Sequence, residues 1–200
     1  MSPKPTQRYH HGDLRPTLLR EAQSMVRELG LDGLSLRQLA QRAGVSASAL
    51  YHHFDNKNAL LCALAEEGFG SLDAAVQGAA RDQSGDLRDQ TLRFVRAYVG
   101  YAAAHPEIYD LMFGRSIWKA GEPTESLRAL AFGTFRRYVD YVGAMDPHVG
   151  RGKTGLRRAQ ARWAAVHGLC RLVIDGVYTD GADLAGMTAA TADLLVGPTD

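Results

Sequence analysis

Apolar residues recur along the chain at the three- and four-residue spacing of amphipathic helices. No sustained run alternates apolar and polar residues, and no Asn-Gly hairpin turn occurs. The first apolar stripe runs from Leu18 to Leu29, with Asp13 before it as an N-cap and Gly30 after it as a stop signal. The pattern predicts an all-α fold of about nine helices. We expect these helices at about residues 14–29, 35–42, 46–54, 56–80, 87–104, a short one from 106, 124–145, 155–178 and 183–196.

The second and third helices are short and form a corner. Ser35, followed three residues later by Gln38, has the pattern of a capping box. Gly44 can adopt a positive φ in the next turn, Val45 can fill the core and Ser46 can cap the following helix. Two short helices joined by such a turn predict a helix-turn-helix.

The second helix of a helix-turn-helix presents its N-terminal residues to the major groove. Ser46 and Ser48 can bond bases or phosphates, and the methyl group of Ala47 can contact a thymine methyl. Leu50 and Phe54 are predicted to anchor the helix from inside. A corner of this kind also occurs in bundles that do not bind DNA, so the spacing leaves both interpretations open. The candidates for contacts with the DNA backbone are Tyr51, His53, Lys57, Arg37 and Arg42.

The distribution of charge favours a polyanion at this end of the chain. Residues 1–57 contain eight Lys/Arg and five Asp/Glu, a net charge of +3 that leaves −2 for the rest of the chain. We divide the chain into an N-terminal arm (1–12), a helix-turn-helix domain (13–57) and a C-terminal helical domain (58–200). Lys4 and Arg8 could place the arm in the minor groove, and the alternative is a solvated tail.

Composition is that of a globular protein, with 46% hydrophobic and 22% charged residues. The chain has no apolar run of about 18 residues, and residues 1–12 lack the apolar core of a signal peptide, so we expect a cytoplasmic protein. Cys62 and Cys170 lie in apolar helical patterns and are predicted to be reduced core thiols, with a redox switch as the alternative.

Sequence motifs of enzymes are missing. The chain has no Gly-rich phosphate loop, no His-Glu-x-x-His pair and no Gly-x-Ser-x-Gly elbow. The adjacent pairs His10-His11 and His52-His53 would point about 100° apart on a helix, which suits joint metal binding poorly. We therefore predict no catalytic activity, no metal and no cofactor.

Residues 18–64 resemble the N-terminal DNA-binding domain of the tetracycline-repressor (TetR) family. The resemblance rests on "LSLRQLA", "AGVS", "LYHHF" and "NK..LL" at fixed spacing, over about a quarter of the chain. It implies a homodimeric repressor whose C-terminal helices bind a small molecule and pair the subunits. His53 matches the family's common His before Phe, whereas His52 falls at a variable position and could read bases or face solvent. The implied DNA-contacting positions are Ser35, Arg37, Ser46, Ala47, Ser48, Tyr51, His52, His53 and Lys57.

The segment "RWAAVHGLCRLVIDGVY" is apolar on two sides, which indicates a helix that is either central in its bundle or shared between subunits. With the last helix it suits a four-helix dimer interface, two helices from each subunit. Trp163, His167 and Gly168, together with "HPEIYDLMFG", resemble a C-terminal subtype of the family named for its Trp-His-Gly motif. The interface candidates are Leu169, Leu172, Val173, Leu184, Met187, Thr191 and Leu194.

Aromatic residues scattered through the middle helices are candidates for a ligand pocket, although each could equally be ordinary core. His167 could contact a ligand or bond a neighbour in the core, and Trp118 could belong to a lid or a partner contact. We predict a transcriptional repressor that is released from its operator by a small apolar effector. The alternative is a DNA-binding regulator or architectural protein without an effector. The pocket candidates are Phe94, Tyr101, Tyr109, Met112, Phe113, Trp118, Phe132, Trp163 and His167.

Overall fold

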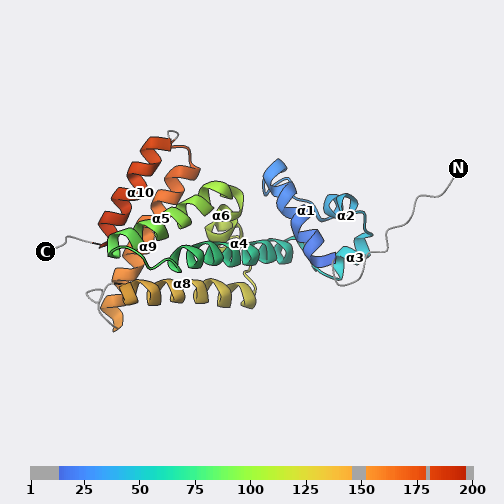
Figure 1. The fold of residues 1–200 in the computed structure, drawn as a ribbon. Coiled ribbons are helices and arrows are strands. Elements are labelled where there is room, and N and C mark those ends of the chain that lie inside the picture. Colours follow the sequence, from blue (N-terminus) through green and yellow to red (C-terminus); the bar gives the residue numbers. More distant parts are fainter. Residues whose placement is uncertain (1–13, 146–151, 179–180, 197–200) are drawn as a thin grey trace.

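A computed structural model describes residues 14–145, 152–178 and 181–196, and every element in these ranges is an α-helix or a connecting turn (Figure 1). This confirms the predicted all-α fold. The arm assigned to residues 1–12, and most of the connection that we expected from residue 146, lie outside the described ranges. The helices are α1 (Leu14–Leu29), α2 (Leu36–Arg42), α3 (Ala47–Tyr51), α4 (Lys57–Ala80), α5 (Leu87–Ala104), α6 (Pro106–Phe113), α7 (Arg115–Trp118), α8 (Glu125–Met145), α9 (Gly152–Ile174) and α10 (Gly181–Val196).

The short N-terminal helices pack around a glycine turn. Gly44 follows α2 with a φ of 68°, and the amide of Val45 donates to the carbonyl of Ala40 at 2.9 Å. With the bond from Gly44 N–H to Gln41 O, this is a Schellman motif, which turns the chain directly into α3. Ser46 caps α3 as predicted, because its Oγ accepts the amide of Ala49 at 3.1 Å.

Four predicted local features are wrong. Ser35 occupies the N-cap of α2 but makes no side-chain capping bond, so the capping box does not form. The third helix ends at Tyr51 rather than Phe54, because the chain must turn to bring Phe54 into the core and Asn56 to the N-cap of α4. Trp118, predicted to lie in a loop, ends the additional helix α7. Helix α9, expected at about 155–178, begins at Gly152 and ends at Ile174.

The long helix α4 joins the two parts of the molecule (Figure 1). It begins at Lys57, and further along it packs against α5, α6 and α8. Helix α1 contacts both α4 and α6. Gly68 permits close packing of α4 on α6, because a Cβ at this position would lie 2.7 Å from both Ile108 Cγ2 and Met112 Sδ.

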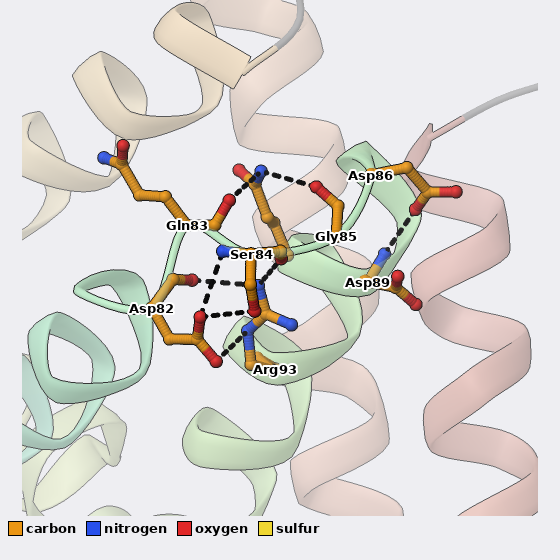
Figure 2. Close-up of polar contacts among 8 residues, drawn as sticks. Asp82, Gln83, Ser84, Gly85, Asp86, Asp89 and Arg93 are labelled. Atoms are coloured by element: carbon orange, nitrogen blue, oxygen red, sulfur yellow. Dashed lines mark hydrogen bonds and ion pairs between the residues drawn. The ribbon is translucent and has the colours of Figure 1, made fainter.

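The α4–α5 turn is held by side chains at the other end of α4. Figure 2 shows Arg93 reaching from α5 to the backbone carbonyl oxygens of Asp82 and Ser84. Asp86 caps α5 by accepting the amide of Asp89 at 2.9 Å. Hydrogen bonds from Ser84 lower the pKa of the Asp82 carboxyl. These bonds satisfy backbone groups that the end of one helix and the start of the next leave open.

Candidate DNA-binding helix and ligand cavity

Helix α3 exposes one face and buries the other. Ala47, Ser48 and Tyr51 are exposed, and His52 at its C-cap is exposed as well. These side chains recur at helical spacing, so they form a continuous outer surface. Because Ser46 Oγ accepts a backbone amide, its hydroxyl hydrogen stays available to a phosphate or a base.

The buried face of α3 fixes its position. Leu50 is fully buried and Phe54 nearly so, which confirms that they are inward anchors. Arg15 of α1 lies over the Phe54 ring at 5.4 Å from the centroid, in cation–π geometry. His53 is half-buried. The exposed face of α3 is therefore held in place by the packing of its buried face.

Two of the predicted phosphate-binding cations have partners within the protein. Arg42 donates to Glu21 at 3.0 Å and to Glu28 at 2.6 Å, so it ties α2 to α1, which corrects the expectation that it is free to reach DNA. The hydrogen bond from Arg42 lowers the pKa of Glu28 to about 2. Lys57 Nζ donates to the carbonyl of Leu31 at 3.0 Å and keeps two further donors. Arg37 is exposed on α2.

The C-terminal bundle contains a cavity of about 760 Å³ that is partly open to solvent. Helices α4 to α9 all contribute to its wall, and the wall is mainly apolar. This volume lies in the range of small-molecule binding sites. The lining residues are Phe69, Leu72, Asp73, Val76, Gln77, Ala80, Phe94, Tyr98, Met112, Phe113, Trp118, Ala131, Thr134, Phe135, Arg137, Tyr138, Tyr141, Gln160, Trp163 and Ala164.

Five of the nine predicted pocket residues line this cavity, namely Phe94, Met112, Phe113, Trp118 and Trp163. They come from four different helices, α5, α6, α7 and α9, which the fold brings together around one space.

The other four predicted residues lie elsewhere. Phe132 is 66% exposed on the outside of α8, which corrects its assignment to a pocket. Tyr101 is buried behind α4, where its hydroxyl donates to the carbonyl of Gly68 at 3.0 Å, and burial raises its pKa to about 12. Tyr109 and His167 form a pair just behind the wall. The prediction missed Phe135, Tyr138 and Tyr141, whose regular three-residue spacing along α8 was the available signal.

His167 is bonded within the core. Its Nδ1 lies 2.7 Å from the Tyr109 hydroxyl, and its ring stacks on Trp163 with centroids 5.1 Å apart. It also packs edge-on against Phe113. Desolvation, aided by the positive charge of Arg171, lowers the pKa of His167. Because Trp163 and Phe113 line the cavity, His167 supports its wall from behind.

We expect acid to destabilise the protein partly through His167. The unfolded chain protonates this histidine near its ordinary pKa of 6.5, whereas the folded protein keeps it neutral. The stability contributed by neutral His167 is therefore present above about pH 6.5 and is lost as the pH falls toward the lowered pKa. The midpoint of urea unfolding should fall more steeply between about pH 7.5 and 5.5 in the natural protein than in His167→Gln. Parallel midpoints for the two proteins would contradict this assignment.

The predicted interface residues divide between core and surface. Leu169 and Thr191 are buried within the subunit, and the Thr191 hydroxyl donates to the carbonyl of Met187 at 2.8 Å. This burial corrects their assignment to a surface between subunits. Leu172 is 40% exposed on α9 and Leu194 is 70% exposed on α10. Val173, Leu184 and Met187 are half-buried.

Exposed small and polar residues on a short capped helix, fixed beside a helical bundle that contains a cavity, are the features of a helix-turn-helix regulator. Residues 18–64 match the sequence profile described as bacterial regulatory proteins of the tetR family, and residues 91–196 match a tetracyclin repressor-like C-terminal domain. The chain belongs to the TetR family of transcriptional regulators, whose DNA-binding unit is the helix-turn-helix. The Trp-His-Gly subtype stays a prediction.

Relatives of known sequence and structure agree with this family. The tetracycline repressor protein class A from transposon 1721 of Escherichia coli is 30% identical over 186 residues, which are 84% of this chain and 83% of the relative. A protein of unknown function from Rhodococcus sp. RHA1 is 36% identical, with a TM-score of 0.80 over 95% of this chain and 97% of that chain. The TetR family transcriptional regulator PfmR from Thermus thermophilus shares the fold at 23% identity, with a TM-score of 0.64 over 90% and 96% of the two chains.

Membrane spans and metal sites are both missing from the described ranges. None of the helices in these ranges is both long and apolar enough to cross a membrane. No group of three or more His, Cys, Asp or Glu side chains among the described residues is arranged to hold a metal ion.

Proposed function

We propose that the protein is a dimeric transcriptional repressor that a small, largely apolar effector releases from its operator. The observation that carries this proposal is the cavity of about 760 Å³, whose wall includes α4, the helix that begins at Lys57 beside the helix-turn-helix. An apolar cavity of this size supports ligand sensing over the alternative of a regulator without an effector. The class A tetracycline repressor, which resembles this chain along most of its length, carries the name of a small molecule.

In the proposed complex, the exposed face of α3 lies in the major groove. Ala47 and Ser48 have no bulky side chains, so the helix backbone can come close to the base edges. Ser46, Tyr51, His52 and His53 flank them, and Ser35, Arg37 and Lys57 contact phosphates. A twofold dimer presents two such helices to half-sites about 34–36 Å apart.

The two subunits pair through α9 and α10 in this proposal. Leu172 and Leu194 are large apolar side chains exposed on the surfaces of these helices. Nothing lies within 4 Å of a Cβ built at Gly168 or Gly186, so a partner helix can approach closely at these positions. Burying the two leucines against their symmetry mates removes apolar surface from water.

The signal passes from the cavity through α4 and α6 to the helix-turn-helix. Met112 and Phe113 of α6 line the cavity, and α6 packs on α4 at Gly68 and also contacts α1. Gln23 of α1 donates to Glu67 of α4 at 2.7 Å. A ligand that favours one spacing of α4 and α6 therefore changes the spacing of the two recognition helices. Near-complete switching requires about 5.5 kcal/mol of differential affinity.

The first test measures binding of the protein to duplex DNA from the region upstream of its own gene, by fluorescence anisotropy. We expect binding about a thousandfold tighter than to a shuffled duplex near physiological salt. A compound screen on the same complex then tests release. Equal, weak and salt-sensitive binding to both duplexes would contradict the expectation that the protein binds an operator upstream of its own gene. Tight, specific binding that no occupant of the cavity weakens would favour the regulator without an effector.

Two substitutions should separate the roles of the proposed contacts. Lys57→Ala removes a phosphate contact, so we expect weaker binding to all sequences and a salt slope reduced by about one. Ser48→Ala should instead relax sequence preference while leaving the salt slope unchanged. Lys119→Ala, which removes an exposed lysine of the C-terminal domain, is the matched control for charge. Equal losses on specific and shuffled DNA for both variants would show that these roles are assigned wrongly.

A further inference from the structure

We propose that the effector is an amphipathic anion, whose apolar body lies among the aromatic rings of the cavity and whose carboxylate head binds Arg137 at the opening. This inference rests on the proposed function, in which the cavity holds the effector, and it names the chemical class of that effector. Three features of the wall carry it: a polar group of residues at one place, an arginine with donors to spare, and a largely aromatic remainder.

Four polar or charged residues of the wall lie where α4 and α8 run side by side (Figure 1). Arg137 of α8 forms an ion pair with Asp73 of α4, in which Nε lies 3.1 Å from Oδ1 and Nη2 lies 3.1 Å from Oδ2. Gln77 donates to Asp73 at 2.8 Å, and Thr134 accepts from Arg137 at 3.1 Å. The Arg137 side chain is 47% exposed and the Asp73 side chain 22%. This group therefore lies where the cavity opens to solvent.

The ion pair leaves donors available but few acceptors. Both oxygens of Asp73 accept hydrogen bonds, Oδ1 from Arg137 and Oδ2 from Gln77. Arg137 uses Nε and Nη2 for its contacts with Asp73 and Thr134, and Nη1 takes part in neither. The two N–H groups of Nη1 can therefore bind an anionic head without displacing Asp73. A cationic head finds no comparable partner, because Asp73 is the one acidic residue among the described residues that line the cavity.

Two further arginines make the α8 side of the cavity more positive. Tyr138 and Tyr141 of α8 also line the cavity. Burial raises the pKa of both hydroxyls, and the positive charge of Arg162 opposes that rise at Tyr138, as the charge of Arg93 does at Tyr141. A positive charge that favours a negative phenolate also favours a negative head group nearby. The wall therefore favours an anion over a cation of the same shape.

The rest of the wall is largely aromatic, since nine of the twenty lining residues carry aromatic rings. The polar atoms of both tryptophans are occupied, because Trp163 Nε1 donates to the Tyr98 hydroxyl at 3.0 Å and Trp118 Nε1 donates to the carbonyl of Met112 at 2.6 Å. Their rings therefore offer apolar faces, against which an apolar body can pack. A charge placed among them would lose its hydration, so the head stays at the opening.

Three probes with one ring system, one linker and different head groups test this chemistry. We would titrate the full-length protein near physiological salt with pyrenebutanoate, pyrenebutanol and pyrenebutylammonium, and follow the pyrene fluorescence. Pyrenebutanoate should bind about fivefold more tightly than pyrenebutanol, as a partly exposed ionic hydrogen bond predicts. Pyrenebutylammonium should bind no more tightly than the alcohol.

Two substitutions within the ion pair should act in opposite directions. Arg137→Gln removes the partner of the anion, so the affinity for pyrenebutanoate should fall to that for pyrenebutanol. Asp73→Asn leaves the guanidinium without its counter-ion, so the affinity for pyrenebutanoate should rise about threefold. If the pair were only structural, both substitutions would weaken binding. Arg136→Gln is the matched control and should keep the fivefold preference, because Arg136 is the neighbouring exposed arginine of α8 and does not line the cavity.

The inference is overturned if the natural protein binds the anion no more tightly than the alcohol, if the ammonium probe binds best, or if none of the three binds. It is also overturned if Asp73→Asn weakens binding of the anion, or if Arg136→Gln abolishes the preference as Arg137→Gln does. Operator release is measured separately by DNA anisotropy. An uncharged or cationic compound that releases the operator would refute the inference and leave the proposed function standing. An anion that binds with the expected pattern but leaves the operator complex intact would support the anion site and contradict the proposed release.

Discussion

Ser48→Glu is expected to lower operator affinity at least about a hundredfold without unfolding the protein. Ser48 is exposed on the outer face of α3, where the proposed complex places it against the base edges. A carboxylate at this position would face phosphates in each of two half-sites, and the direct contact of the serine would be lost as well. The fold should tolerate the change, because position 48 is the second residue of α3 and a negative charge at a helix N-terminus is favourable. Anisotropy with operator duplex measures the affinity, and circular dichroism checks the fold.

Ser71→Glu is the matched control for this prediction. Ser71 is exposed on α4, within the C-terminal part of the molecule, so its replacement adds the same charge away from the recognition helix. We expect near-natural affinity in this variant. Retained operator binding by Ser48→Glu would exclude α3 as the element that enters the groove.

Leu194→Arg is expected to convert the proposed dimer into a monomer at micromolar concentration. Leu194 is 70% exposed in the single subunit, so an arginine there costs little in its folding. In a twofold interface each copy would bury an unpaired guanidinium, and the penalty is incurred twice. Since the proposed complex uses two recognition helices, operator affinity should fall at least about tenfold. Sedimentation velocity measures the change of mass, and anisotropy measures the loss of affinity.

Phe132→Arg serves as the control for the interface. Phe132 is a similarly exposed apolar residue, at 66%, but it lies on the outer face of α8. Its replacement should leave both the mass and the operator affinity unchanged. If this variant dissociates and Leu194→Arg does not, the subunits pair through α8 instead.

Local signals predicted the helix-turn-helix well because its determinants are close in sequence. Gly44 and Ser46 act on backbone groups within a few residues, and each does so where it was expected. The capping box at Ser35 failed because a capping pattern permits a hydrogen bond without requiring it. Arg42 was misjudged because its carboxylate partners belong to α1, a different helix.

The cavity was predicted only in part, for a physical reason. An aromatic residue on an apolar stripe has the same periodicity whether it faces a packed core or a cavity, so Tyr138 and Phe132 could not be distinguished from Phe94. The difference arises when α4 to α9 converge and leave a space that their side chains do not fill. The same limit applies to Leu169, whose burial depends on a neighbouring helix.

By itself, the sequence determined the all-α class, most helix boundaries and the exposed face of α3, because caps, glycine turns and helical periodicity act over a few residues. Tertiary structure alone decided which rings surround the cavity, which charges cancel, and which leucines of α9 and α10 stay exposed. These properties depend on side chains that are distant in sequence and meet only when the helices pack.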